Sequence, residues 1–393
     1  MKTYNLVFVL FLCCINLLHS QIPYLDSCFS SISYSDLTYG VNQTVDNTNQ
    51  KLILRLFTPD GDTSSSRKCL LWMHGGGFQT GSYTDSDQVY ICEYFAQKGY
   101  VTASIEYRLG LGTSSGCIGG IEAEYRAAQD YKAAVRYIKK NAIIYNIDTN
   151  QIFVGGSSAG AITAMHCAYW DIDEVPSVMA NNLGDFTASG SAGYSDKVAG
   201  VVSWAGGIED TLWLQNETIP FIAIHDRYDM EVPYKTQLIC QTNNDYIFGD
   251  YLVYKFLNDQ KIYTNLFTYY KSIHVPSMGE SAYYEWLDTT CQQLYRLTLF
   301  EITSPLNSIE NLNNNTNLFS ITSNHSHIHI DLIENKLPFY VSIFDVLGKK
   351  IASSEIQNLK NTITLAPTIH GLIEVVLQNS NSTIVDSKTL FIP

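Results

Sequence analysis

The sequence predicts an α/β protein: a mostly parallel β-sheet covered by helices on both faces, followed by a small all-β sandwich. Short apolar runs typical of buried strands alternate with segments of helical periodicity between residues 50 and 300. The composition then changes at an Asn-rich polar stretch, and short alternating runs follow it. We therefore expect a leader at 1–20, a large α/β domain at 21–304, a linker at 305–317 and a β-sandwich at 318–393.

The elements of the large domain are predicted one by one from local patterns. Apolar runs mark the strands, and apolar residues that recur at helical spacing mark the helices. Gly110–Gly120 and Trp170–Asp196 are rich in small and polar residues and are expected to be loops, the second of them shaping a pocket. The expected strands are Lys51–Phe57, Cys69–Met73, Tyr100–Ile105, Gln151–Val154, Ile219–His225 and Leu266–Tyr270, and the expected helices are Ile121–Ala142, one starting near Ala161, and Glu280–Phe300.

The stretch Gly156–Gly160 has the pattern G-x-S-x-G between a predicted strand and a predicted helix. A sharp turn in that context leaves no room for side chains at its two glycines. It would hold Ser158 in a strained conformation, with its hydroxyl exposed above the sheet and the helix N-terminus behind it. The pattern therefore predicts Ser158 as a nucleophile.

Three consecutive glycines follow another predicted strand, in the stretch His74–Phe78. Glycines let the backbone approach a ligand closely, and acyl transfer needs N–H donors for the negative charge that develops on oxygen. We expect an oxyanion hole formed by the N–H groups of Gly76 and Gly77 and completed by that of Ala159. The alternative is a Gly-rich turn without a chemical role.

These two stretches, together with Glu106–Leu109, resemble the carboxylesterase/lipase branch of the α/β-hydrolases. The resemblance implies the α/β-hydrolase fold and a triad in the order Ser, acid, His. The D-x-x-V-P spacing points to Asp229 as the acid, with Asp226 as a rival because the family usually has Gly there. His274 follows the last predicted strand of the domain and is the expected base.

The triad Ser158, Asp229 and His274 with its oxyanion hole predicts a secreted serine carboxylic-ester hydrolase that needs no cofactor and no metal. Its partner would be an ester substrate, either a small molecule or a polymer. A serine peptidase or amidase on the same triad, and a hydrolase-fold protein that binds without catalysis, remain alternatives.

The other histidines are interpreted as structural. His166 lies in the helix after the nucleophile and is expected to be packed, whereas His225 at a strand end is expected to hydrogen-bond near the acid loop. His325, His327 and His329 alternate and would share one face of a strand. A metal site there is the alternative to a solvated strand face.

Residues 1–20 have the pattern of a secretory signal peptide, with Met1-Lys2, an apolar run from Leu6 to Leu18, and then Ser20-Gln21. The run is too short to span a membrane, and no later stretch is long and apolar enough to do so. We therefore expect an exported protein without a membrane span.

Export favours disulfides, and an odd number of cysteines follows the leader. Cys69 and Cys167 are expected to be buried thiols of the core. The candidate pairs are Cys240 with Cys291 and Cys92 with Cys117.

The charge balance excludes one class of partner. The chain has 24 Lys and Arg against 38 Asp and Glu, a net charge of −14. The phosphates of nucleic acids and of anionic membranes repel such a surface. We expect no nucleic-acid partner.

Beyond the linker, Val341–Asp345 followed by Gly348-Lys349-Lys350 resembles the C-terminal sorting domain of the bacterial type IX secretion system. Gly371–Val376 and Lys388–Leu390 lie where that family has its later signatures. The resemblance implies the secretion machinery as a partner and a secreted or cell-surface location, whereas the alternative is a carbohydrate-binding or adhesion sandwich. The strands expected here are His327–Leu332, Tyr340–Asp345, Thr362–Leu365, Ile373–Leu377 and Lys388–Ile392.

Overall fold

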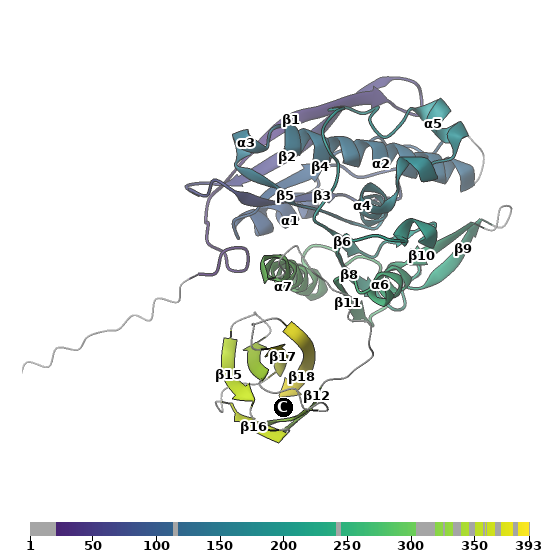
Figure 1. Ribbon diagram of the computed structural model, residues 1–393. Helices are drawn as coiled ribbons and strands as arrows, with labels where there is room; N and C mark the ends of the chain where they lie inside the picture. The colour runs from purple at the N-terminus through teal and green to yellow at the C-terminus, as the bar shows by residue number, and fades with distance from the viewer. Residues whose placement is uncertain are drawn as a thin grey trace, which may run out of the picture. The chain divides into compact units, whose positions relative to one another are not determined.

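The chain divides into two compact units, Met1–Leu287 and Asp288–Pro393, and each is described by itself (Figure 1). The leader and the linker predicted at 1–20 and 305–317 lie outside the described residues. None of the helices in the described part of the chain is long and apolar enough to cross a membrane. The computed structural model describes residues 21–112, 117–240, 245–303, 319–324, 327–332, 339–345, 350–356, 358, 360–365, 371–379 and 384–392.

The first unit is built on an eight-stranded sheet. Its strands are β1 (Ile32–Gln43), β2 (Asn49–Pro59), β3 (Arg67–Met73), β4 (Val101–Ile105), β5 (Ile147–Ser157), β6 (Gly200–Trp204), β8 (Phe221–Asp226) and β11 (Thr264–Tyr269). Their order is β1-β2-β4-β3-β5-β6-β8-β11, and among these strands β2 alone runs against the common direction. This is the strand order of the α/β-hydrolase fold, so the predicted fold class is confirmed.

Helices cover both faces of this sheet (Figure 1). They are α1 (Ser86–Ala96), α2 (Cys117–Lys140), α3 (Ala142–Tyr145), α4 (Ala159–Tyr169), α5 (Ser177–Leu183), α6 (Asp250–Asp259) and α7 (Ser281–Thr303), with short 3-10 turns at Ile172–Glu174 and Thr211–Leu214. The side chains of neighbouring residues in β3 point to opposite faces of the sheet, because side chains alternate along a strand. Leu71 belongs to the same buried cluster as Tyr131 of α2, whereas the ring of Trp72 lies 5.1 Å from that of Trp204, which in turn contacts Trp286 of α7.

Several elements of the first unit were not predicted. Strand β1 is mostly exposed, so it has no buried apolar run to reveal it. The stretch Gly110–Gly120 was expected to be a loop, but α2 begins at Cys117 and includes two of its glycines. The expected loop Trp170–Asp196 contains α5, and it is fixed by an aromatic cluster that includes Trp170 and Phe186. A second small sheet, ordered β7-β10-β9, is formed by β7 (Gly207–Ile208), β9 (Thr236–Cys240) and β10 (Asp245–Gly249).

The cysteines of the core are thiols. Cys69 and Cys167 are buried and unpaired, as predicted. Cys92 is also a free, buried thiol, so its predicted pairing with Cys117 is wrong; α1 turns Cys92 into the apolar core beneath it, where burial raises the thiol pKa. The side chain of Cys240 lies outside the described residues, and its pairing with Cys291 stays a prediction.

The second unit contains two antiparallel sheets, β12-β13-β16 and β15-β14-β17-β18. Their strands are β12 (Phe319–Asn324), β13 (His327–Leu332), β14 (Phe339–Asp345), β15 (Lys350–Ile356), β16 (Lys360–Thr364), β17 (Gly371–Asn379) and β18 (Ile384–Ile392). One buried cluster combines Ile328 and Ile330 of the first sheet with Val341 and Ile343 of the second. The two sheets therefore form the expected small sandwich. The polar strands β12 and β15 were not predicted.

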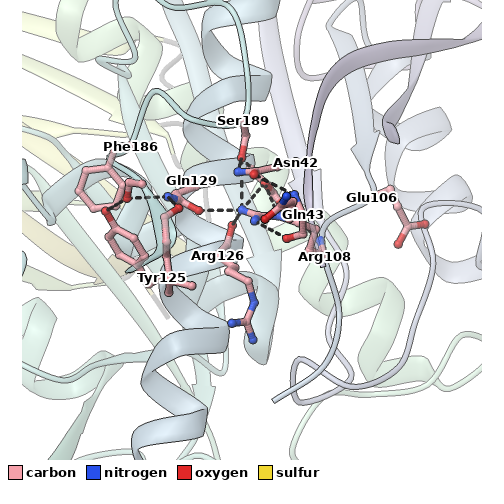
Figure 2. Close-up of polar contacts among 12 residues, drawn as sticks. Asn42, Gln43, Glu106, Arg108, Tyr125, Arg126, Gln129, Phe186 and Ser189 are labelled. Carbon is pink, nitrogen blue, oxygen red and sulfur yellow. Dashed lines mark hydrogen bonds and ion pairs between the residues drawn. The ribbon is translucent and has the colours of Figure 1, made fainter. Parts of the chain in front are cut away.

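A buried ion pair joins the segment after β4 to helix α2. The Nη2 atom of Arg108 lies 2.9 Å from the Oδ1 atom of Asp130, and both side chains are almost fully buried. The guanidinium also donates to the backbone oxygen of Gln43 at 2.9 Å and to the Ser189 hydroxyl at 3.2 Å (Figure 2). This single cation therefore ties the end of β1, helix α2 and the segment around Ser189 together.

We predict that Asp130→Asn lowers the free energy of unfolding by about 3 kcal/mol or more, because it leaves Arg108 as a buried charge without its partner. The matched control is Asp36→Asn, whose partner Arg55 is partly exposed, and its cost should stay below about 1 kcal/mol. Urea unfolding followed by tryptophan fluorescence measures both, since every Trp lies between residues 72 and 286, within the first unit. Equal losses in the two variants would contradict the importance assigned to the buried pair.

Candidate functional site

Ser158 occupies the sharp turn between β5 and α4 with φ 54° and ψ −123°, a strained conformation for a residue other than glycine. Its backbone N–H donates to the carbonyl oxygen of Trp204 at 2.8 Å. A Cβ atom on Gly160 would lie 2.0 Å from the carbonyl oxygen of Met73, and one on Gly156 would lie 2.4 Å from the carbonyl carbon of Gly160. The turn can therefore form only with glycine at both positions.

Three side chains that follow the carboxyl ends of β5, β8 and β11 form a hydrogen-bonded row. The Nε2 atom of His274 lies 2.7 Å from the Ser158 Oγ atom, and its Nδ1 atom lies 2.6 Å from the Oδ2 atom of Asp229. The Asp229 side chain is fully buried, whereas those of His274 and Ser158 are partly exposed. Because Nδ1 donates to the carboxylate, Nε2 is left to accept a proton, which is the arrangement that activates a hydroxyl as a nucleophile.

The two aspartates after β8 have different partners. The Oδ1 atom of Asp229 accepts the backbone N–H groups of Glu231 at 2.8 Å and Val232 at 3.1 Å. Burial would raise the pKa of the Asp229 carboxyl, but hydrogen bonds from two histidines outweigh it and hold that pKa well below its usual range. Asp226 instead accepts the backbone N–H groups of Tyr228 and Lys271, so it joins the loop of Asp229 to the loop of His274. Asp229, not its rival, hydrogen-bonds to the histidine.

The glycine stretch after β3 lies beside the Ser158 turn. A Cβ atom on Gly75 would lie 3.2 Å from the Ser158 Cβ atom. Gly76 and Gly77 both have positive φ, 103° and 59°, so the stretch needs glycine there. Within the part of the chain that the structure describes, the N–H groups of Gly76, Gly77 and Ala159 donate to no protein acceptor. Three backbone donors in the segments that meet at Ser158 are thus available to a ligand.

His74 and Tyr107 hold this glycine stretch in place. Their rings stack with centroids 4.5 Å apart. The Tyr107 hydroxyl lies 3.3 Å from the backbone oxygen of His74 and 3.2 Å from that of Gly75, and it donates to them. A Cβ atom on Gly81 would lie 2.3 Å from the His74 Nδ1 atom. These contacts explain why the stretch Glu106–Leu109 accompanies the three glycines.

A second histidine contacts Asp229. His225 is fully buried at the end of β8, and its Nε2 atom lies 3.3 Å from the Oδ2 atom of Asp229 while its Nδ1 atom lies 3.0 Å from that of Asp250. Burial would lower the pKa of His225, but the two carboxylates outweigh it and raise the pKa to about 9. The sequence analysis predicted His225 as a hydrogen-bonding residue here but did not identify Asp250. The signal that could have found Asp250 is an acidic residue at a helix start, where the helix dipole favours a negative charge.

Among the residues that the structure describes, one group has the spacing of metal ligands: Glu124, His166 and Glu209, with ligand atoms within 4.8 Å of one another. His166 Nε2 lies 2.5 Å from Glu209 Oε2, so His166 is packed as expected but also paired. Burial and the neighbouring Glu209 raise the pKa of Glu124 well above its usual range. Among the described residues, the Nδ1 atom of His166 and the Oε1 atom of Glu209 in this cluster are buried without a hydrogen-bond partner.

The described C-terminal histidine side chains belong to no group of possible metal ligands. His329 Nδ1 lies 2.9 Å from the Thr362 hydroxyl of the neighbouring strand. His325 lies outside the described residues, as does the side chain of His327. The alternative of a metal site on this strand therefore stays untested by these contacts.

Comparisons with known proteins relate the chain to esterases. Residues 54–231 match the model of the BD-FAE family, a segment that contains Ser158 and Asp229 but not His274. Phenmedipham hydrolase of Pseudarthrobacter oxydans is 39% identical over 111 residues, which is 28% of this chain and 21% of that protein. Gut esterase 1 of Caenorhabditis elegans is 33% identical over 93 residues, 23% of this chain and 16% of that protein. The matches span about a fifth of each relative's length.

Among solved structures, the propionate-bound esterase Est2 of Thermogutta terrifontis resembles the chain with a TM-score of 0.49 at 19% identity. The alignment covers 70% of this chain and 96% of that one. The fold assignment rests on the strand order of the first unit and not on this likeness. The sequence matches support the resemblance to the carboxylesterase branch of the α/β-hydrolases.

We predict a loss of stability between pH 6.5 and 9 that depends on His225. Below about pH 6.5 the residue is protonated in both the folded and unfolded states; as the pH rises, the unfolded chain loses the proton first, and the stabilisation disappears by about pH 9. The full effect is about 3 kcal/mol. Urea unfolding at several pH values, for wild type and His225→Gln, measures it: the wild-type advantage should shrink across this window. A constant difference would refute the charged state assigned to His225.

Proposed function

We propose that this protein is a serine carboxylic-ester hydrolase. The observation that carries the proposal is the hydrogen-bonded row of Ser158, His274 and Asp229, with donor–acceptor distances of 2.7 and 2.6 Å. The neighbouring N–H groups without acceptors add to it. The sequence similarity to Gut esterase 1 and to Carboxylesterase 5A supports an ester as the bond that is attacked, in preference to an amide.

In the proposed reaction, the Ser158 Oγ atom attacks the ester carbonyl carbon while His274 Nε2 takes its proton. The bond to the alcohol then breaks, and His274 gives the proton to the departing oxygen. Water next attacks the acyl group on Ser158 and loses a proton to His274. The bond between the acyl carbon and the Ser158 Oγ atom then breaks, His274 returns the proton to Oγ, and the carboxylic acid leaves. Asp229 keeps the imidazole in the required tautomer and stabilises its charged form.

The negative charge of each tetrahedral intermediate needs hydrogen-bond donors that are already in place. We assign this role to the N–H groups of Gly76, Gly77 and Ala159. The positive φ of both glycines and the start of α4 at Ala159 support the assignment, since rigid backbone donors lose little freedom when they bind the oxyanion.

Ser158→Ala should lower ester turnover by at least about 10⁴-fold without unfolding the protein, because no other hydroxyl is activated in its place. The neighbouring Ser157→Ala is the matched control and should keep most of the activity. Hydrolysis of p-nitrophenyl esters, compared with p-nitroanilides, measures both the loss and the preference for esters. A fluorophosphonate should label wild type and Ser157→Ala only. Substantial turnover by Ser158→Ala would rule out the mechanism.

Asp229→Asn should lower kcat by about 10³-fold or more, because an amide favours the wrong tautomer of His274. Asp226→Asn provides the comparison: its carboxylate holds two backbone N–H groups, and an amide oxygen can still accept, so the loss should stay near about tenfold. Steady-state kinetics of both variants tests the assignment. A larger loss for Asp226→Asn would make that residue the acid.

We also propose that the protein is secreted through its C-terminal sandwich by type IX machinery, so that it acts outside the cell or on its surface. The leader-like residues 1–20 and the similarity of Val341–Asp345 to a sorting signature support this location. The sandwich has its own buried core, which suits a module with a separate task.

A chain that ends near Ser304 should keep its kcat on soluble esters, because Ser158, Asp229 and His274 all precede the cut. In a bacterium with type IX machinery, the truncated enzyme should stay in the periplasm while the full chain reaches the medium or cell surface. Immunoblots of the fractions measure this, with full-length Ser158→Ala showing that export does not need activity. Export of the truncated chain would refute the sorting role. Loss of binding to an insoluble polymer would instead favour a binding module.

A further inference from the structure

The environment of His225 determines its charge. Its Nδ1 atom faces the Oδ2 atom of Asp250 at 3.0 Å, and its Nε2 atom faces the backbone oxygen of Val232 at 3.1 Å and the Oδ2 atom of Asp229 at 3.3 Å. A carbonyl oxygen has no proton to donate, and an ionised carboxylate has none either. Both ring nitrogens therefore carry hydrogen, and the ring is an imidazolium.

Both carboxylate oxygens of Asp250 also accept hydrogen bonds from other groups. Its Oδ1 atom accepts the hydroxyl of Ser203 at 2.7 Å, and its Oδ2 atom accepts the backbone N–H of Gly206 at 3.1 Å. It is also the first residue of α6, where the positive end of the helix dipole favours a negative charge. The rings of His225 and Tyr234 also meet in a T-shaped arrangement, with centroids 5.6 Å apart.

The charges at the site therefore alternate in a row from Asp250 through His225 to Asp229, and His274 follows as the base. The side chains of Asp250, His225 and Asp229 are fully buried. The same Oδ2 atom of Asp229 faces both histidines, at 3.3 Å and 2.6 Å. The Asp229 carboxylate is thus held between His225 and His274, and its negative charge interacts with both rings.

We propose that His225, kept as an imidazolium by Asp250, is a positioning residue for the ester hydrolysis, fixing the Asp229 carboxylate against His274 and offsetting part of its charge. This rests on the proposed function. Without the cation, Asp229 would attract a proton onto His274 more strongly, and the base would become neutral only at higher pH. Without the hydrogen bonds, the carboxylate would also lose its fixed place, and transition states tolerate little misplacement.

The kinetic test compares His225→Gln with wild type in the full chain. The acidic limb of kcat/KM should move to higher pH by about one unit, and kcat should fall by about tenfold with KM nearly unchanged. His166→Gln is the matched control: it is another fully buried histidine paired with a glutamate, outside the proposed site, and it should leave the limb where it is. The proposal would be overturned if His225→Gln had the wild-type kcat and the wild-type acidic limb of kcat/KM.

Asp250→Asn tests whether the second aspartate acts through the histidine. Alone, it should move the limb in the same direction as His225→Gln. Combined with His225→Gln, it should add no further upward shift, because the cation it supports is already gone. Additive upward shifts would show two separate structural effects and would contradict the row of charges.

Nitrogen-15 NMR of histidine-labelled wild type tests the charge of His225 directly, without kinetics. The signals that disappear in His225→Gln or shift in Asp250→Asn should show two protonated ring nitrogens at pH 7.5 and titrate near pH 9. A single protonated nitrogen at pH 7.5 would overturn the proposal. Failure of the proposed function is distinguishable, because it would appear as ester turnover that survives Ser158→Ala.

Discussion

The close approach of helix α4 to the end of β3 is the constraint on which the site depends. Gly160, in the first turn of the helix, lies so near the Met73 carbonyl that no Cβ atom fits between them. This contact places the turn with Ser158 directly beside Gly75 and the glycines that follow it. The Ser158 hydroxyl thus meets backbone N–H groups that have no acceptor among the described residues, because two segments of backbone touch without help from long side chains.

Two sets of opposite charges are buried together in the first unit. Arg108 and Asp130 are one such pair, and Asp229, His225 and Asp250 form a longer row. A buried charge without a partner would lower the free energy of unfolding by several kcal/mol. Each of these groups therefore stays charged only while its neighbour is ionised. This interdependence has a chemical consequence at the proposed site. The negative charge of the Asp229 carboxylate, which orients His274, is itself partly offset by the positive charge of His225.

The predicted elements that the structure confirms are those with a strong local pattern. The runs around Cys69–Met73 and Gln151–Val154 became β3 and β5, and the helical spacing after residue 121 became α2. Strand β1 was missed because pairing with β2, and not burial of its own residues, makes it a strand. The Cys92–Cys117 pairing failed for a related reason, since the orientation of a cysteine depends on the face of the helix that packs inward.

The sequence alone determined the fold class, the Ser158 turn and the glycine stretch, because apolar periodicity and glycine geometry are properties of neighbouring residues. Tertiary structure decided which carboxylate reaches His274. Asp226 and Asp229 both lie at the end of β8, and the parallel pairing of β8 with β11 places the histidine against Asp229. It also brought Asp250 to His225 and Glu209 to His166. Contacts between distant segments follow from sheet order and helix packing, which no local pattern records.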